Sequence, residues 1–382
     1  MKKQQLKEKV RMDLRLDHPQ FFEPFIGQDL SAQHRFTKGD FCDQTILNFD
    51  GKVVLQTRDG GKTWAPYKGP RTFPMATRGI YDFGDELVAI NGGTSLKRSF
   101  DDGITWGAEE KIPSPDDIHV RGLGAPNCFS AIKTASDSLV LVSDNFLGQE
   151  GPGGQLISSH VSKDRGRTWE IGRMFMPAFP LPGGPEGFGE PAVVEMTPGW
   201  LWMVMRSLYG ELWQCMSRDG GYNWNDPTPT GLVSPIANCY AVQHPDSKAV
   251  VLSWNMTIPG VPKDFRSSKS IYRPRTNLVF AISHDRCKTW SCPIVVEEKG
   301  GFYPTIYFSE DDMFIMYQSS PDEKKHSWHE YGLGLVAYDR KAVDDLPPWD
   351  LQTIQPYIEA GYVRHWLAMN CADPGRSNAA LD

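Results

Sequence analysis

The chain has 382 residues, a formal net charge of −7 and a hydrophobic fraction of 40%, which is enough apolar residue for one large core or for two ordinary domains. The acidic balance argues against nucleic acid as a partner, and no run of about 18 apolar residues is present that could cross a membrane. The N-terminal segment MKKQQLKEKVRMDLRLD lacks the apolar core of a signal peptide, so we expect a cytoplasmic protein, or a secreted one if a leader has been removed.

The first predicted element is a strand over residues 10–17. Val10, Met12, Leu14 and Leu16 alternate with charged residues there, and a period of two is typical of a strand. The strand stands alone before the first group of strands, so we expect it to pair with the sheet formed by the last residues of the fold, where it would cover an exposed edge.

An octapeptide then recurs five times along the chain. Its pattern is a hydroxyl residue, any residue, Asp, any residue, usually Gly, any residue, Thr or Asn, and Trp. The copies are TRDGGKTW (57–64), SFDDGITW (99–106), SKDRGRTW (162–169), SRDGGYNW (217–224) and SHDRCKTW (283–290). The Asp can accept hydrogen bonds from backbone N–H groups two or three residues on, the Gly supplies a positive φ, and the Trp places a large ring beside the turn. Each copy therefore predicts an anchored β-turn, which must be strained or adjusted in the fifth copy, where Cys287 replaces the Gly.

The spacing of the copies predicts the architecture. Their Asp residues follow one another at steps of 42, 63, 55 and 66 residues, and a period of about 40 to 50 residues, with insertions, is that of a four-stranded propeller blade. Short β-rich runs precede nearly every copy, so we expect small antiparallel sheets in a radial array, with each octapeptide turning between the third and fourth strands of its sheet.

These repeats resemble the Asp-boxes of the sialidase (neuraminidase) superfamily, whose six-bladed propellers carry them. The resemblance covers nearly the whole chain. It implies an all-β fold, a single six-bladed β-propeller domain over residues 1–382, with the strand at 10–17 closing the ring as the outer strand of the sixth blade. Apolar residues at helix-like spacing predict a short C-terminal helix over 350–370. Taken in order, the six blades are expected at 33–64, 75–106, 127–169, 190–224, 238–290 and, without an Asp-box, from 303 to about 338.

Strand direction predicts which residues can meet. The start of a blade's first strand and the end of its second strand lie on one face of a propeller, and the Asp-boxes lie on the other. Glu190 opens blade four and Arg206 closes its second strand, 16 residues later. Arg275 precedes the strand that runs into the fifth box, with Arg273 as an alternative, and Tyr303 opens blade six. By themselves, these residues could also be surface or rim positions of ordinary hairpins.

The resemblance implies a role for each. In sialidases a Glu at the place of Glu190 polarises a catalytic tyrosine, which here corresponds to Tyr303, and arginines at the places of Arg206 and Arg275 hold the substrate carboxylate. The residue types suit that chemistry, because bidentate guanidinium groups match a carboxylate in charge and shape. A phenol activated by Glu avoids the repulsion that a carboxylate nucleophile would meet at an anomeric carbon bearing a carboxylate.

The N-terminal third departs from the family pattern, because the Arg-Ile-Pro strand that opens sialidases is missing. By topology, Arg35 would be the third arginine of the clamp and Asp50 the acid/base, although the turn around Asp50 is also a plain hairpin turn. Asp40 and Asp43 are rivals of Asp50. Arg78 opens blade two in a stretch that looks like the family's first strand, but Asn91 stands where its Asp is wanted.

The sequence therefore predicts a retaining exo-glycosidase acting on a terminal sialic acid or a related nonulosonic or ulosonic acid. The alternatives are a non-catalytic Asp-box propeller that binds glycans or proteins, and a polysaccharide lyase on a similar propeller. His119, His160 and His284 do not have the spacing of metal ligands, so we expect neither a metal nor another cofactor. The partner would be an acidic sugar or glycan, and the oligomeric state is left open.

Overall fold

The computed structural model describes residues 6–13, 33–34, 45–49, 53–57, 59, 62–72, 74, 77–91, 95–113, 127–146, 155–173, 187–257, 275–319 and 332–363. Within these residues the strands form six four-stranded sheets, each with antiparallel neighbours. Each sheet is named below after its innermost strand.

The strands follow one another along the chain, four to a sheet. The β2 sheet contains β2 (Gln33–His34), β3 (Thr45–Phe49), β4 (Val53–Thr57) and β5 (Ala65–Pro66). The β6 sheet contains β6 (Thr77–Asp82), β7 (Leu87–Asn91), β8 (Ser95–Ser99) and β9 (Glu110–Lys111). The β10 sheet contains β10 (Asn127–Lys133), β11 (Leu139–Phe146), β12 (Gln155–Ser162) and β13 (Glu170–Ile171).

The second half of the chain repeats this plan until the last sheet. The β14 sheet contains β14 (Phe188–Thr197), β15 (Trp200–Ser207), β16 (Glu211–Ser217) and β17 (Thr228–Val233). The β18 sheet contains β18 (Tyr240–Gln243), β19 (Val250–Asn255), β20 (Leu278–Ser283) and β21 (Ile294–Glu297). The β22 sheet contains β22 (Gly301–Phe308), β23 (Asp312–Ser319), β24 (Gly332–Asp339) and, at its outer edge, β1 (Glu8–Asp13).

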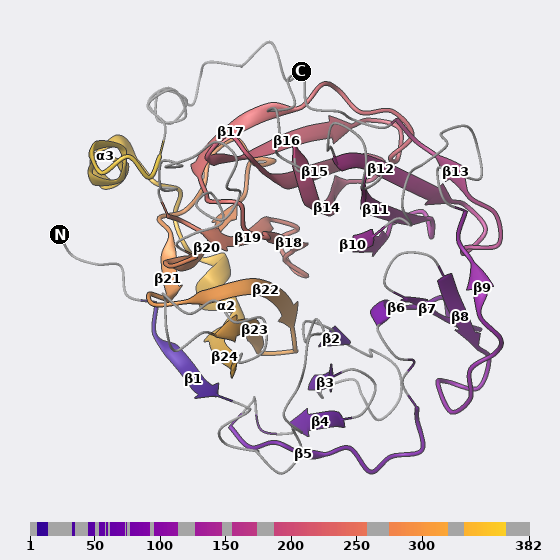
Figure 1. The fold of residues 1–382 in the computed structure, drawn as a ribbon. Coiled ribbons are helices and arrows are strands. Elements are labelled where there is room, and N and C mark those ends of the chain that lie inside the picture. The colour runs from indigo at the N-terminus through magenta and orange to yellow at the C-terminus, as the bar shows by residue number, and fades with distance from the viewer. Residues whose placement is uncertain are drawn as a thin grey trace.

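The sheets surround a common centre, with their first strands nearest to it (Figure 1). Consecutive inner strands contact one another in the order β2, β6, β10, β14, β18, β22. Both faces of a sheet are covered by its neighbours, so the strands carry apolar residues on both sides; Trp202 of the β14 sheet, for example, packs on Trp290 of the β18 sheet with ring centroids 5.8 Å apart. The fold is an all-β β-propeller, as the repeats predict.

The N-terminal strand pairs with the last strand of the fold. β1 lies antiparallel to β24, with Arg11 opposite Val336 and Met12 opposite Leu335. Arg11 also donates a hydrogen bond of 2.6 Å to the carbonyl of Val296, which ties the N-terminus to the β18 sheet as well. The strand begins two residues before the predicted range of 10–17, and residues 14–17 lie outside the described part of the chain.

The Asp-boxes occupy the turns between third and fourth strands. In all five, the Asp accepts a hydrogen bond of 2.8–2.9 Å from the backbone N–H four residues on and another from the side chain of that residue. In the last three boxes the N–H three residues on also donates to the Asp, as expected. The donor four residues on was not predicted, and it widens the loop that each Asp closes.

Positive φ angles in the boxes explain the glycines. Gly221 has φ 103°, and its backbone N–H donates to Ser217 Oγ at 2.9 Å. Cys287, at the same place in the fifth box, has φ 64° and makes the same bond to Ser283 Oγ at 2.9 Å. The predicted strain at Cys287 is confirmed, because a residue with a Cβ adopts this conformation at a cost.

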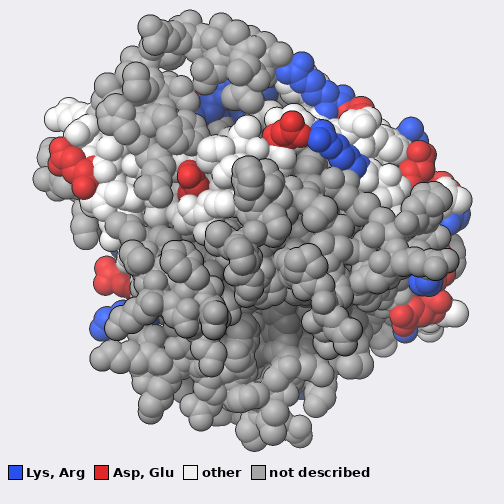
Figure 2. All heavy atoms as spheres, turned by 45° about the horizontal axis from the view of Figure 1, so that its top comes forward, with Lys and Arg blue, Asp and Glu red and all other residues white. Residues whose placement is uncertain are grey.

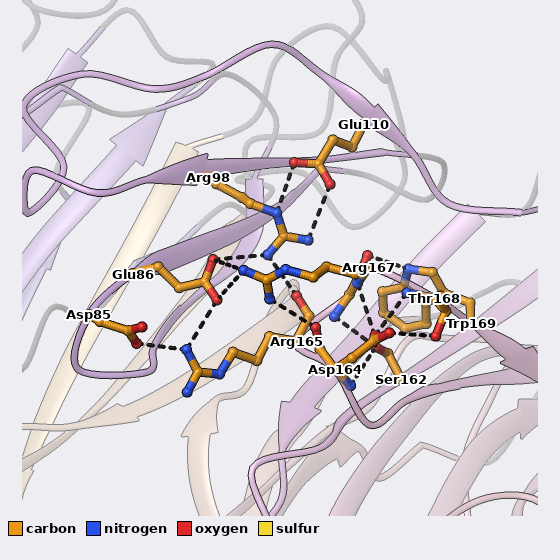
Figure 3. Close-up of polar contacts among 11 residues, drawn as sticks. Asp85, Glu86, Arg98, Glu110, Ser162, Asp164, Arg165, Arg167, Thr168 and Trp169 are labelled. Atoms are coloured by element: carbon orange, nitrogen blue, oxygen red, sulfur yellow. Dashed lines mark hydrogen bonds and ion pairs between the residues drawn. The ribbon is translucent and has the colours of Figure 1, made fainter.

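A buried carboxylate joins the β6 sheet to the third Asp-box. The side chain of Glu86 is completely inaccessible, and three guanidinium groups surround it: Arg98 at 3.1 Å, Arg165 at 3.3 Å and Arg167 at 3.0 Å (Figure 3). Burial opposes ionisation of Glu86, but hydrogen bonds from the arginines outweigh it and lower the pKa of the carboxyl. Because Arg165 and Arg167 belong to the box, the network fixes one blade against the next.

Within the described residues, two helices follow the last strand. α2 spans Arg340–Asp344 and α3 spans Leu351–Glu359; α3 lies at the outside of the molecule in Figure 1, with Ile354 buried in the core between the β14 and β18 sheets. The helix predicted over 350–370 is shorter at its C-terminal end: Gly361 turns the chain with φ 79°, and Val363 then pairs with Leu232. Residues 364–370 lie outside the described part. Neither α2 nor α3 is long and apolar enough to span a bilayer.

Candidate functional site

Among the described residues, four inner strands, β6, β10, β14 and β22, shift register near their start, and the bulges of β14 and β22 form the candidate site. The register of β14 against β15 shifts between Gly189 and Ala192, and that of β22 against β23 shifts between Phe302 and Thr305. Glu190 lies in the first bulge with φ 45° and Tyr303 in the second with φ 52°. Such a conformation costs about 1–3 kcal/mol for a residue with a Cβ and is found most often at functional sites.

The local sequence suits these bulges, because each is followed by proline. Pro191 and Pro304 have no backbone N–H, so they fit where the ladder is interrupted and no donor is needed. The dipeptides Glu-Pro and Tyr-Pro at the start of an inner strand are therefore a signal in the sequence that sequence reasoning did not use.

Glu190 lies between a phenol and a guanidinium. The hydroxyl of Tyr303 donates a hydrogen bond of 2.7 Å to Glu190 Oε1, across 113 positions of sequence, and Arg206 Nη1 lies 2.6 Å from Glu190 Oε2. The contact with Arg206 is a close ion pair rather than a well-aligned hydrogen bond. The side chains of Arg206 and Glu190 are only 7% and 5% exposed, so the carboxylate is held in a water-poor setting with a cation on one side and a phenol on the other.

Arg275 approaches Tyr303 from the neighbouring sheet. Its guanidinium lies 5.3 Å from the centre of the Tyr303 ring and 5.6 Å from that of Phe302, and its Nη2 donates to the carbonyl of Ile236 at 3.1 Å. The residue is 6% exposed, yet Nε and Nη1 have no hydrogen-bond partner among the described residues. A buried guanidinium with two unused donors is suited to an anionic ligand.

The four residues therefore meet on one face, as strand direction predicts. The Asp-boxes lie at the other end of the same strands, since Gly189 pairs with Arg206 at one end of β15 while Leu201 pairs with Ser217, the first residue of the fourth box, at the other.

Two buried polar residues join this group, and sequence reasoning missed both. Asp144, near the end of β11, accepts a hydrogen bond of 3.1 Å from the backbone N–H of Glu190. Asn255, the last residue of β19, donates to the carbonyls of Gly301 at 2.7 Å and Thr276 at 3.1 Å. Both lie at or near the end of the second strand of their sheet, as Arg206 does, so the same topological rule could have found them.

Most of the other candidates of the sequence fall outside the described part of the chain. Arg35 and Asp50 are outside the described residues, as are Asp40, Asp43 and Arg273. Arg78 is the second residue of β6, and its side chain is outside the described part. Asn91 ends β7 and its amide donates to Ser95 Oγ at 3.4 Å.

Charged groups elsewhere on the surface are mixed in sign. On the face drawn in Figure 2, described basic and acidic residues lie interspersed.

Among the described residues no group of three or more His, Cys, Asp or Glu side chains is arranged to hold a metal ion. Cys239, which lies near Glu190 and Arg206, is buried, and burial raises the pKa of its thiol to about 12, so it is a neutral thiol at the edge of the site.

Comparisons with known proteins agree with this fold. A structure from Dyadobacter fermentans, described as a protein of unknown function, superposes with a TM-score of 0.59 at 14% identity, over 87% of this chain and 98% of the other. A Trypanosoma rangeli sialidase in complex with 2,3-difluorosialic acid, described as a covalent intermediate, gives 0.51 at 14% identity, over 84% of this chain and 59% of the other. A Hadza microbial sialidase gives 0.50 at 18% identity, over 76% and 59%.

The chain thus spans nearly the whole Dyadobacter protein but only about three-fifths of these two sialidases. No curated protein matches it. The profile of the BNR repeat-like domain matches residues 80–316, which is more than half of the chain. This match shows that the chain belongs to the BNR repeat-like domain family, in agreement with the propeller and its Asp-boxes.

Proposed function

We propose that the protein is a retaining exo-glycosidase that hydrolyses a terminal sialic acid, or a related nonulosonic or ulosonic acid, with Tyr303 as nucleophile. The observation that carries the proposal is the 2.7 Å hydrogen bond from the Tyr303 hydroxyl to Glu190. A free phenol has a pKa of about 10 and is a poor nucleophile at neutral pH. A carboxylate within hydrogen-bond reach can accept the phenolic proton and so activate the oxygen. Sialidases are among the glycosidases that use tyrosine in this way.

The reaction runs in two displacements. Tyr303 Oη attacks the anomeric carbon while its proton passes to Glu190, and the bond from that carbon to the leaving oxygen breaks as the oxygen takes a proton from an acid. Water then attacks the same carbon and returns a proton to that acid, while the bond to Tyr303 breaks and Glu190 gives the proton back. Two inversions leave the configuration retained. Asp50 is our candidate for the acid.

The substrate carboxylate would lie against Arg275. Its unused Nε and Nη1 groups can donate hydrogen bonds to a carboxylate, and its place beside the Tyr303 ring would put that carboxylate next to the attacked carbon. Arg206 would lie beside the substrate carboxylate while balancing the charge of Glu190. Arg35, with Arg78 as the alternative, would complete the clamp from the N-terminal sheets.

We also infer that each of the six sheets is one blade and that residues 1–382 form a single domain. In support, the inner strands contact one another in chain order. In the first five sheets the outer strand follows the Asp-box, whereas in the C-terminal sheet β1 takes that outer position. Joining both ends of the chain in one sheet would close the ring and leave no inner blade edge exposed.

The test of the function is a panel of fluorogenic α-ketosides of sialic acid, deaminated sialic acid and Kdo. We expect turnover of at least one, and a loss of at least about a hundredfold in kcat for Tyr303→Phe. Tyr307→Phe is the matched control, since Tyr307 lies four residues further on the same strand and stacks on Phe314; it should keep the wild-type rate. The difluoro analogue of the accepted sugar should label Tyr303 covalently.

Other results would contradict the proposal. Near-normal turnover by Tyr303→Phe, or a label on another residue, would exclude Tyr303 as nucleophile. Glycan binding without turnover would favour a binding propeller, and release of an unsaturated sugar that absorbs in the ultraviolet would favour a lyase.

A further inference from the structure

The catalytic pair is presented by two bulges, and a buried polar side chain from the preceding sheet hydrogen-bonds the backbone at or directly before each bulge. Asp144 of the β10 sheet reaches the first strand of the β14 sheet, and Asn255 of the β18 sheet reaches the first strand of the β22 sheet. Both residues are almost fully buried, with 1% and 0% of their surface exposed. In both sheets, a residue at or near the end of the second strand thus hydrogen-bonds the backbone of the next sheet's first strand, Asp144 as acceptor and Asn255 as donor.

We propose that Asp144 and Asn255 are positioning residues, which hold the bulges of β14 and β22 so that Glu190 and Tyr303 face one another. The inference deepens the proposed function, since it concerns the same pair. Neither side chain is required to touch the substrate; each acts through the backbone of a residue that does.

Asp144 controls the conformation of Glu190. Its Oδ2 accepts the backbone N–H of Glu190 at 3.1 Å, at the point where the register of the β14 ladder shifts and φ is 45°. In a regular strand this N–H would donate to a carbonyl of the neighbouring strand or to water. The carboxylate of Asp144 gives it a buried acceptor instead, and thereby favours the left-handed conformation that directs the Glu190 side chain to Tyr303.

Asn255 connects the two segments that carry Arg275 and Tyr303. Its Nδ2 donates to the carbonyl of Thr276, which follows Arg275, and to that of Gly301, two residues before Tyr303. Both partners are carbonyls, so only the amide nitrogen can face them. One carboxamide therefore sets the spacing between the guanidinium and the phenol, whose ring lies 5.3 Å away.

A blade can form without such a bulge. β18, the inner strand between these two, pairs with β19 in continuous register from Tyr240 to Gln243. Two serines in the same strands as Asp144 and Asn255 make ordinary buried hydrogen bonds that do not involve the site. Ser143 bonds to Ser158 at 2.9 Å, and Ser253 donates to the carbonyl of Val279 at 2.8 Å; both are fully buried, so each is a matched control for its neighbour.

The experiment observes Tyr303 directly, in protein labelled with 3-fluorotyrosine. Its ¹⁹F resonance is assigned by its absence from Tyr303→Phe, and Glu190→Gln supplies the reference for a phenol whose partner has changed. We expect Asp144→Leu and Asn255→Ala to move the resonance, while Ser143→Ala and Ser253→Ala leave it in place. Asp144→Asn keeps an acceptor oxygen and should restore the wild-type signal. Asp144→Ala and Asn255→Ser serve if either first variant fails to fold.

Activity is the second measurement. With the 4-methylumbelliferyl α-ketoside that the wild type accepts, Asp144→Leu and Asn255→Ala should lose at least about tenfold in kcat with KM within about twofold, because geometry in the transition state is lost while binding is retained. A Tyr303 resonance that stays in place in both variants overturns the proposal, whatever the rate. A moved resonance in a protein that cleaves no ketoside keeps the positioning roles and overturns the proposed hydrolysis alone.

Discussion

The ion pair between Glu190 and Arg206 can be tested without knowledge of the substrate, through the stability of the protein. We consider Arg206→Met and Glu190→Gln, each of which removes one charge with little change in volume, and the double variant. The structure holds Arg206 Nη1 at 2.6 Å from Glu190 Oε2, with both side chains more than nine-tenths buried. Either single change therefore leaves an uncompensated charge in a water-poor site.

The magnitude follows from burial and distance. Two unit charges about 4 Å apart attract by about 4 kcal/mol at an effective dielectric constant of about 20, and the loss of one member of a buried pair typically costs about 3–5 kcal/mol. The double variant should cost clearly less than the sum of the two single ones, because it leaves no orphaned charge. We expect a coupling energy of about 2–4 kcal/mol between the two changes. The cost of Glu190→Gln by itself should be the smaller of the two single costs, because its amide oxygen can still accept from Tyr303.

The assay is urea unfolding followed by fluorescence of the twelve tryptophans, with midpoints compared at constant slope. Ser253→Ala provides the cost of one buried hydrogen bond in an uncharged setting. If the costs of Arg206→Met and Glu190→Gln add up to that of the double variant within about 0.5 kcal/mol, the two groups are not paired in solution. The charge balance of Glu190 inferred from the structure would then be refuted.

Three further predictions concern the turns and the contacts between blades. Asp219→Ala removes four hydrogen bonds of the fourth Asp-box and should lower stability by about 1–3 kcal/mol without changing kcat; a fall in kcat at an unaltered melting temperature would contradict a purely structural role. Hydrogen bonds from the box threonines and serines lower the pKa of Asp101 and Asp164 to about 2, although burial opposes the shift at Asp164, so both carboxylates stabilise the fold above the unfolded value of about 4. This stabilisation is lost as the pH falls from about 4 through 2, and the melting temperature of Asp101→Asn should depend less steeply on pH in that window than that of the wild type. Glu86→Gln should cost about 2–4 kcal/mol, because Arg98 stays buried with only Glu110 to balance it; an unfolding midpoint within error of the wild type would show that the network contributes nothing.

The features that the sequence by itself determined are local. Each Asp-box is closed by hydrogen bonds that span at most four residues, so its eight residues carry the information for the turn, and only the donor four residues on was missed. The alternation of Val10 and Met12 with charged residues predicts a strand in the same way. Glu190, Arg206, Arg275 and Tyr303 could be placed on one face because strand direction alone orders the ends of a blade, and the structure brings all four together.

The tertiary structure decided which atoms meet. Tyr303 bonds to Glu190 across 113 residues of sequence, and such a contact depends on how the blades are turned around the centre, which no local periodicity encodes. For the same reason, sequence reasoning assigned Arg206 only to a substrate clamp, whereas its guanidinium is the counter-charge of Glu190. Asp144 and Asn255 looked like ordinary strand ends, because their partners lie 46 residues away in the chain, and only the packing of one blade against the next turns their side chains to the backbone that carries the catalytic pair.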